Sequence, residues 1–332
     1  KLMAVLLICT AGSSFAQIDF SSFLEGGVDD ANTLLENYLE PAFVGFGYGI
    51  NSGWYNTAKP HKLLGFDITV TGTAAMVPSD AEFFTINDND YENISLNANS
   101  RAAGNDQAPT LFGPNLGADD LPLLDYRSDG GQSISISAPT GLGIDESIPF
   151  NAVPSAMVQL GIGLVKNTDL KVRFVPTIES EGEYEFSLFG LGVVHDLKQW
   201  IPGFKQLPID ISGFVGWNRL NTKIFLDEQS PDQVAEFSTN GFSVQGLVSK
   251  TLPVLTVFAG VGFATTTTNF DLLGTYETDA GTFTDPSSFA FSSSGPRANI
   301  GARIKLLILT LHVDYALQKY NTLTVGAGLS IR

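Results

Sequence analysis

The sequence predicts an all-β protein, an antiparallel transmembrane β-barrel of about 12 to 14 strands with an N-terminal helical plug segment. Three observations lead to this prediction. Apolar residues alternate with small or polar residues in many segments. After residue 16, no stretch approaches the roughly 18 to 20 continuous apolar residues that a membrane helix needs. The connections between the alternating segments fall into a short class and a longer, acid-rich class.

The alternation is clearest at the C-terminal end. In Thr322–Arg332, every second residue from Leu323 to Ile331 is apolar, and the other residues are small or polar. Such a period gives a strand one apolar face and one polar face. Ten segments are predicted as strands, and Phe83–Ile86 and Gln132–Ala138 are expected to add a hairpin or two. The ten are 63–77, 156–165, 170–179, 183–195, 209–225, 238–249, 254–268, 296–305, 308–318 and 322–331.

The N-terminal region divides into two parts. Residues 1–16 are predicted to be a secretory signal, because a basic residue precedes an apolar run and small residues end at Ala16. The only cysteine, Cys9, lies in this signal, so the mature chain would lack a thiol for disulfides, metal ligation or nucleophilic catalysis. Residues 17–60 are assigned to a helix and plug (hatch) segment, and 61–332 to the barrel.

Apolar residues between Asp29 and Leu39 follow a three-to-four spacing, which predicts a short amphipathic helix that ends at Pro41. Phe43–Ile50 and a polar turn region, 51–60, follow. An apolar helix stripe must be buried, and the barrel mouth is the economical place for it. The alternative is that Phe43–Ile50 is itself a barrel strand and that only the helix lies in the periplasm.

Strand parity assigns faces to individual residues. Leu170, Val172, Phe174 and Ile178 are predicted to face lipid and Thr177 to face inward; on the 209–225 strand, Val215 and Trp217 face lipid while Ser212 and Asn218 face inward. A charged side chain on the lipid face costs roughly 2–4 kcal/mol at the midplane, so the ionisable residues should point into the lumen. The predicted lumen-lining residues are Asp67, Lys171, Arg173, Asp210, Arg303, His312 and Asp314; Phe189 and Phe214 would add apolar surface if they also turned inward.

Charge is unevenly distributed over a chain with a net charge of −17. The acidic loop region 79–155 and the other long connections carry most acids, including Asp227, Glu228 and Asp279, whereas the short connections carry lysines (Lys166, Lys198, Lys205, Lys250 and Lys305). This asymmetry is typical of the outer membrane of a Gram-negative bacterium, with lysines in the periplasm and acids outside. The absence of a basic stripe argues against nucleic acid as a partner.

Two stretches carry a family resemblance. Trp54–Pro60, after a helix and a glycine-rich stretch, resembles the plug entry of the long-chain fatty-acid transporter (FadL-like) family, although Thr57 stands where that family has proline. Over the whole length, including His195–Phe204 and Leu306–Tyr315, the chain is more closely similar to an uncharacterised outer-membrane barrel family of Bacteroidota. The transporter resemblance implies a fourteen-strand barrel with an N-terminal hatch and passage of apolar molecules.

The expected function is therefore a plugged channel that binds or takes up a small apolar ligand such as a fatty acid, with Trp54, Tyr55 and Asn56 as the ligand-binding or plug residues. The alternative is a structural barrel subunit of a surface or secretion assembly without transport. Outer-membrane lipid is an expected partner, and protein partners would dock at periplasmic turns or extracellular loops.

No enzyme is expected, because His312 and Asp314 share a face but no flanked serine motif accompanies them. The run Asp88–Glu92 resembles a calcium loop only superficially, since it lacks the glycine and distant glutamate of an EF-hand. We expect no metal site and no cofactor.

Overall fold

A computed structural model describes residues 24, 27–127, 133–144, 151–180, 183–226, 230–278 and 281–331 of the 332-residue chain. The predicted secretory signal over 1–16, with Cys9, lies outside the described residues. So do Gln132 of the predicted 132–138 strand, and Asp227, Glu228 and Asp279 of the acidic connections.

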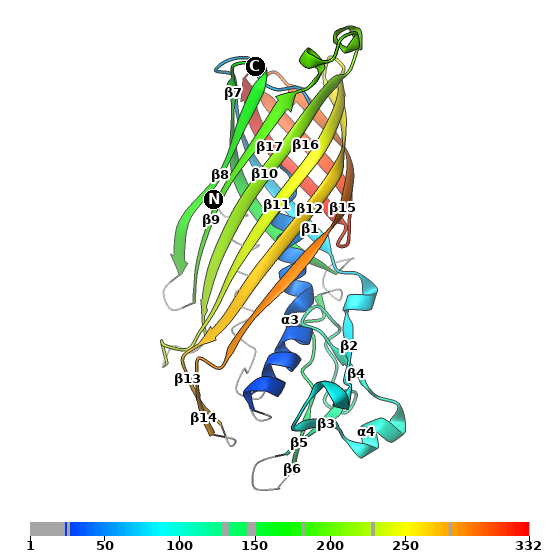
Figure 1. Cartoon of the computed structure of the whole chain (residues 1–332), viewed down its shortest axis with the longest axis vertical. Coiled ribbons are helices and arrows are strands. Elements are labelled where there is room, and N and C mark those ends of the chain that lie inside the picture. Colours follow the sequence, from blue (N-terminus) through cyan, green and yellow to red (C-terminus); the bar gives the residue numbers. More distant parts are fainter. Residues whose placement is uncertain are drawn as a thin grey trace.

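Ten antiparallel strands form a closed barrel (Figure 1), in which β1 closes the ring by pairing with both β7 and β17. The predicted antiparallel barrel and the N-terminal helix are confirmed, whereas the predicted count of about 12 to 14 strands is wrong. The strands are β1 (Phe66–Met76), β7 (Ala152–Leu164), β8 (Thr168–Ser180), β9 (Tyr184–Asp196), β10 (Asp210–Phe225), β11 (Val234–Thr251), β12 (Leu255–Leu273), β15 (Ser287–Leu306), β16 (Leu309–Leu317) and β17 (Thr322–Ile331).

The two extra hairpin segments fold outside the barrel instead. β2 (Phe83–Thr85) pairs with β4 (Gln107–Pro109), while β6 (Ser133–Ser137) joins β5 (Leu123–Arg127) and β3 (Ile94–Leu96) in a small sheet. Each has three to five residues, fewer than the roughly 9–11 that span a bilayer as a tilted strand. With α4 (Ala98–Ala103) and the single turns η2 (Ser79–Ala81) and η3 (Asp88–Asp90), they form what we call the cap, residues 77–127 and 133–144.

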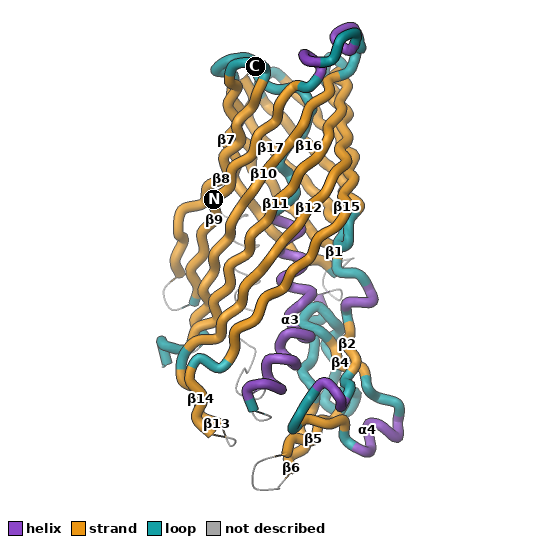
Figure 2. Tube along the Cα trace, in the orientation of Figure 1, coloured by secondary structure: helices purple, strands orange, loops and turns teal. Residues whose placement is uncertain are grey.

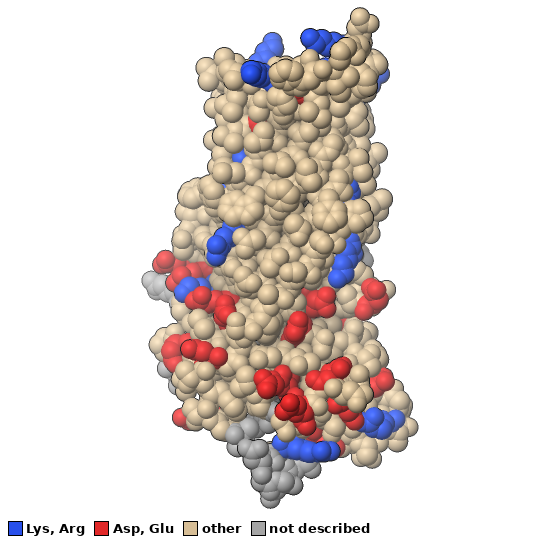
Figure 3. Space-filling view, viewed as in Figure 1, with Lys and Arg blue, Asp and Glu red and all other residues tan. Residues whose placement is uncertain are grey.

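The two ends of the barrel differ (Figures 1 and 2). At the turn end, the strands are joined by 165–167, 197–209, 252–254 and 307–308; β1 begins there, and the C-terminus lies there. At the loop end lie the cap and a separate hairpin of β13 (Thr275–Thr278) and β14 (Gly281–Thr284). Acidic side chains gather at the loop end on the face seen in Figure 3.

The outer wall carries exposed apolar side chains on all ten strands. We call one set of these, with one residue for each strand, the apolar belt: Ile68, Leu160, Phe174, Leu191, Val215, Val244, Val261, Ile300, Leu311 and Val325. On each strand, the residues that alternate with the exposed apolar ones point inward, and most of them are small or polar, as the period-2 pattern predicts.

The predicted parity fails at one place. β8 carries an irregularity between Val175 and Ile178, which shifts the register against β9. A bulge adds a residue to one strand and so reverses the faces beyond it. Ile178, predicted to face lipid, therefore packs against the buried core, and Thr177, predicted to face inward, is exposed. Phe214 turns inward, but Phe189 faces outward.

The helix α3 runs from Val28 to Ile50 and includes Pro41, so the predicted end at Pro41 and the alternative strand over Phe43–Ile50 are both wrong. A proline inside a helix costs about 3 kcal/mol, but tertiary packing repays it here. Every residue from Pro41 to Ile50 is buried, and a β-carbon at Gly45 or Gly47 would overlap the barrel wall at Val153 or Thr266. The enclosing wall holds the chain helical beyond the proline.

Three rings of the wall, Phe237, Phe270 and Phe291, lie 5.0–5.5 Å from the ring of Phe43, which is fully buried. The main hydrophobic core therefore sits between α3, the long strands β11, β12 and β15, and the cap. None of the helices in the described part of the chain is long and apolar enough to cross a membrane.

Candidate functional site

Beyond α3 the chain continues through the inside of the barrel. Residues 51–61, which we call the lumen segment, lead from the end of α3 to the turn end, where β1 starts (Figure 1). All but Lys59 and Pro60 are buried. The N-terminal region therefore enters the barrel at the loop end and leaves it at the turn end, with the lumen segment as its plug.

Trp54 is the centre of the lumen segment and is 1% exposed. Its indole ring lies under the guanidinium of Arg173, 3.7 Å from the ring centroid, and 5.7 Å from the ring of Phe214. A β-carbon at Gly192 would stand 2.9 Å from the indole and 3.2 Å from the Phe214 ring. Glycine at this position of β9 leaves the flat wall against which the indole packs.

Arg173 is fully buried and binds the backbone of the plug. It donates hydrogen bonds to the carbonyl oxygens of Ile50 (2.5 Å) and Ser52 (2.6 Å), and its Nε donates to Oε1 of Gln159 (3.1 Å). The Gln159 amide in turn donates to the Trp54 carbonyl (3.0 Å). The positive charge thus sits among three oxygen acceptors, two of them on the plug.

Four further hydrogen bonds fix the half of the lumen segment that lies toward the turn end. The Tyr55 hydroxyl lies 2.5 Å from Oε1 of Gln245 and 2.6 Å from Oδ1 of Asn299. The Ala58 amide donates to the Ser249 hydroxyl (3.0 Å), and the Ser212 hydroxyl donates to the Ala58 carbonyl (2.5 Å). Asn56 is also buried there. The predicted plug residues Trp54, Tyr55 and Asn56 therefore all lie inside the barrel.

An ionic cluster holds the end of the lumen segment against the barrel wall at the turn end. His61 donates its backbone amide to Asp169 (2.7 Å), and its Nδ1 lies 2.8 Å from the same carboxylate. Lys171 bridges Asp169 (3.6 Å) and Asp67 (3.2 Å). Buried charges are tolerated when they are paired and hydrogen-bonded, as these are. The cluster joins the plug to β1 and β8, and it contains two predicted lumen residues, Asp67 and Lys171.

The remaining predicted lumen residues are Arg303, His312, Asp314 and Asp210. Arg303, His312 and Asp314 are buried inside the barrel, and Asn299 donates to Asp314 (3.3 Å). Asp210 is half-buried at the start of β10. No hydrogen bond joins His312 to Asp314 in the described structure, and neither ring nitrogen of His312 has a hydrogen-bond partner there.

Sequence reasoning missed several residues that bind the plug, chiefly Gln159, Gln245, Asn299 and Arg297. Arg297 donates to the Ser52 hydroxyl (3.0 Å) and to Gln318 (2.7 Å). The signal was available, because Arg297, Asn299 and Arg303 share the inward parity of β15. Of these three residues, only Arg303 was predicted to line the lumen.

Neither the plug nor the cap presents a metal centre. Among the residues that the structure describes, no three His, Cys, Asp or Glu side chains gather in an arrangement that could hold a metal ion. In the stretch Asp88–Glu92, the Asp88 carboxylate accepts from the Leu96 amide and from Arg101.

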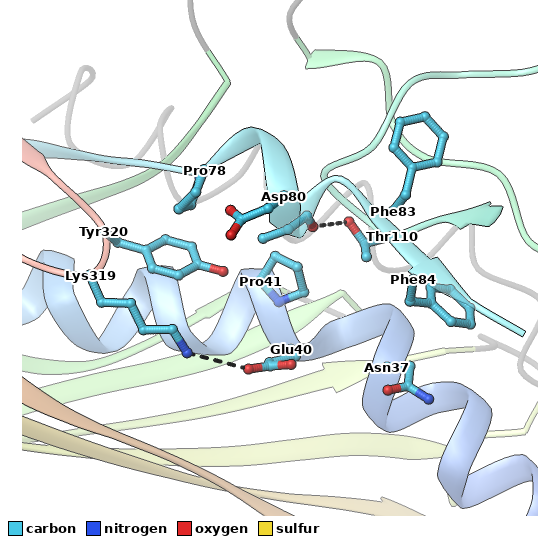
Figure 4. A pocket seen from close by; sticks show the side chains of 11 residues that line it. Asn37, Glu40, Pro41, Pro78, Asp80, Phe83, Phe84, Thr110, Lys319 and Tyr320 are labelled. Carbon is cyan, nitrogen blue, oxygen red and sulfur yellow. Dashed lines mark hydrogen bonds and ion pairs between the residues drawn. The ribbon is translucent and has the colours of Figure 1, made fainter. Parts of the chain in front are cut away.

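One cavity opens at the loop end between α3 and the cap (Figure 4), with a volume of about 340 Å³. Pro41, Phe83, Phe84 and Tyr320 are among its apolar lining residues. Lys319 lies 3.7 Å from Glu40 across one side, as Figure 4 shows. Burial, then the carboxylates of Glu40 and Asp80, raise the pKa of Tyr320.

Comparison with solved structures finds several β-barrels at low identity. The chain is similar to the attachment invasion locus protein Ail of Yersinia pestis (7% identity, 81% of this chain and 98% of that chain, TM-score 0.29). It is also similar to the translocator domain of the autotransporter NalP of Neisseria meningitidis (11%, 82% and 90%, TM-score 0.31) and to Neisserial surface protein A (8%, 80% and 97%, TM-score 0.25). Likenesses at this level carry no functional argument.

Comparison with curated proteins finds no significant match. The FadL-like resemblance and a Bacteroidota source therefore stay predictions. A family model, by contrast, matches nearly the whole sequence, residues 1–331, and the chain accordingly belongs to that family, described as a family of unknown function (DUF6588).

Proposed function

We propose that the protein is an outer-membrane barrel of a Gram-negative bacterium, sealed by its own N-terminal segment, which acts as a closed structural platform for the acidic cap. The observation that carries the proposal is the clamp formed by Arg173 on the backbone of Ile50 and Ser52. A barrel that holds its plug with a buried cation is built to stay closed.

The outer wall supports the placement in a membrane. The apolar belt surrounds the barrel, and exposed aromatic rings lie on four adjacent strands: Phe174, Phe189, Trp217 and Phe242. Phe174 pairs with Phe189, Trp217 pairs with Phe242, and the Phe189 and Trp217 rings are 6.4 Å apart. Neighbouring aromatic rings on the outer wall are typical of the interfacial girdle of a membrane barrel.

Passage through the lumen would require the plug to leave, and the contacts oppose this. Withdrawal would leave the Arg173 guanidinium buried without the Ile50 and Ser52 carbonyls, and would also separate His61 from Asp169. Leaving a buried charge without its partner costs about 3–5 kcal/mol. The closed state therefore dominates unless an external partner supplies that energy.

Reconstituted full-length protein in planar bilayers and in proteoliposomes tests the proposal. We expect no open-channel current and no permeation of small sugars. The Arg173→Met variant should show intermittent current, because its clamp is lost. Stable conductance of the wild-type protein would refute the closed platform.

A second candidate function is the binding of a small apolar ligand such as a fatty acid, and the cavity of Figure 4 favours it. Its lining combines the rings of Phe83, Phe84 and Tyr320 with charged side chains, Glu40, Asp80 and Lys319, so an apolar chain could pack on the rings while its carboxylate met Lys319. The cavity also borders α3, so an occupant would contact the helix that leads to the plug. Native mass spectrometry of the refolded chain with oleate distinguishes the candidates. If oleate binds to the wild-type protein and is lost in Phe84→Ala, the cavity is the site. If oleate is lost in Trp54→Ala and Asn56→Ala instead, the site is at the plug.

A further inference from the structure

The turn end of the barrel carries apolar side chains where a barrel end in water would be polar. Each of the four turns, and the chain that enters β1, exposes at least one large apolar side chain, and each has a lysine within or beside it. The apolar set is Leu63, Leu64, Val165, Leu197, Trp200, Ile201, Phe204, Leu207, Leu252, Val254, Leu307 and Ile308. The lysines are Lys62, Lys166, Lys198, Lys205, Lys250 and Lys305.

Two of these leucines occupy backbone positions that leucine disfavours. Leu64 has φ +64° and Leu307 has φ +56°, the left-handed region where glycine or asparagine is usual. Leu64 is 73% exposed and Leu307 is 93% exposed. Contacts within the protein do not repay the backbone cost of such side chains, so a contact outside the chain is the natural explanation.

The longest turn, 197–209, holds its apolar residues in a fixed arrangement. Lys198 donates to the Ile209 carbonyl (2.7 Å), Gln199 donates to the Lys166 carbonyl (2.8 Å), and the Trp200 indole donates to His195 (2.8 Å). The short turns η5 (Lys198–Trp200) and η6 (Phe204–Gln206) lie in it. Trp200, 61% exposed, is thus held by its polar edge while its apolar surface stays open.

We propose that the turn end is embedded in the headgroup layer of an anionic phospholipid leaflet, with 197–209 lying in the interface as an anchor and the lysines contacting lipid phosphates. The inference rests on the proposed membrane placement and goes beyond it by naming the lipid. Indole rings and leucines favour this layer, and a lysine near an anionic surface gains free energy from it.

Two features favour a lipid leaflet over a protein partner. The five apolar tips are spaced around the whole ring, since the turns join β7–β8, β9–β10, β11–β12 and β15–β16 and the fifth lies at the start of β1. A protein partner would cover one side. The tips also continue the apolar belt without a polar break at β16, where Leu309 and Leu311 are both 59% exposed.

Charge complementarity selects an anionic lipid. Lys62, Lys166, Lys205 and Lys250 are exposed at this end. The acids there are half-buried (Asp196 and Asp210) or buried in the ionic cluster with Lys171 (Asp67 and Asp169). The Asp196 carboxylate also accepts the backbone amide of Lys198 (2.8 Å). The rim therefore presents a positive ring to the leaflet.

The three tryptophans, Trp54, Trp200 and Trp217, allow a direct test in the full chain, because they lie in the lumen, at the turn end and on the outer wall. We would fold Trp217→Phe and Trp200→Phe variants into nanodiscs of phosphatidylglycerol and phosphatidylcholine. Fluorescence quenching would be measured with brominated acyl chains, a headgroup-level nitroxide lipid and aqueous iodide. Trp54 is buried in both variants and supplies a constant background.

We expect the headgroup quencher to reach Trp200 and iodide to be largely excluded from it, while brominated chains quench Trp217. Quenching of Trp200 by brominated phosphatidylglycerol should exceed that by brominated phosphatidylcholine. Replacing Lys166, Lys205 and Lys250 with glutamine should reduce this preference by up to about fivefold per lysine. The charge-matched control, Arg101, Arg127 and Lys319 to glutamine at the loop end, should leave it unchanged.

The failures are distinguishable. Iodide quenching of Trp200 without lipid quenching, together with normal quenching of Trp217, would overturn the interfacial anchor and leave the membrane placement intact. Equal quenching of Trp200 by both lipids, unaffected by the lysine changes, would overturn the selection of anionic lipid. Absence of lipid quenching at Trp217 would overturn the membrane placement and the anchor with it.

Discussion

Replacing Arg173 with methionine should loosen the plug without opening the barrel wall. Methionine keeps an unbranched apolar stem but is shorter than arginine and has no hydrogen-bond donor. The carbonyls of Ile50 and Ser52 then lose their charged donor inside the lumen, and the Trp54 indole loses the cation above it.

The magnitude follows from three contributions. A hydrogen bond to a charged group is worth about 1.5–3 kcal/mol, and Arg173 makes two to the N-terminal segment, at the carbonyls of Ile50 and Ser52. The desolvated contact with Trp54 adds about 2 kcal/mol. Relief of the cost of burying a charge, several kcal/mol, opposes these terms. We therefore expect a net loss of about 3 kcal/mol in plug docking, which is about a hundredfold in its equilibrium constant.

Hydrogen exchange with mass spectrometry measures this loss directly in nanodiscs. Amides of residues 50–61 should exchange about a hundredfold faster in Arg173→Met than in the wild-type protein, while the amides of β10 and β11 keep their protection. Arg219→Met is the matched control, because Arg219 is exposed on the outer wall and donates only locally, to Asn221. Unchanged exchange of the lumen segment in Arg173→Met would refute the clamp.

Two further predictions concern packing and the cap. In Gly192→Val the new side chain would overlap the Trp54 and Phe214 rings, so plug docking should weaken by about 1–3 kcal/mol in the same exchange assay. The control Gly295→Val has open space at its β-carbon and should leave plug docking unchanged. Equal effects of the two variants would contradict the packing of Trp54 against Gly192. In Asp30→Ala the carboxylate that accepts the amides of Glu92, Asn93 and Ile94 (2.6–2.8 Å) is lost, which should free the cap at a cost of about 3 kcal/mol. Limited proteolysis should then cut residues 77–127 faster than in the exposed control Asp29→Ala, and identical cleavage would exclude this role of Asp30.

The barrel strands could be predicted because the signal is local. Period-2 alternation arises wherever a strand has one polar and one apolar face, whatever its distant partners are. All ten predicted segments overlap the ten barrel strands. The bulge in β8 was not predicted, although Pro176 lies between Val175 and Ile178 and a proline inside a strand is typical of a bulge. Phe83–Ile86 also looked like a strand, and it is one in part, but length alone separates a cap strand from a spanning one.

The site was harder to predict, for the same physical reason. Arg173 was recognised as inward-facing from parity, but its partners are carbonyls of Ile50 and Ser52, which have no sequence signature. The helix was predicted to end at Pro41 because proline usually breaks a helix that is exposed to water. The barrel wall encloses α3 and keeps it helical through Pro41. Contacts between distant segments decided both cases.

The path of the N-terminal region has a consequence for biogenesis. Because α3 and residues 51–61 precede β1 in the chain and β1 pairs with β17, the seam of the barrel forms between the first and the last of its ten strands in chain order. The wall touches α3 so closely at Gly45 and Gly47 that the finished ring leaves little clearance for threading a helix. We expect the seam to close last, around a plug already in place, so that the insertion machinery receives a filled barrel and never an open pore.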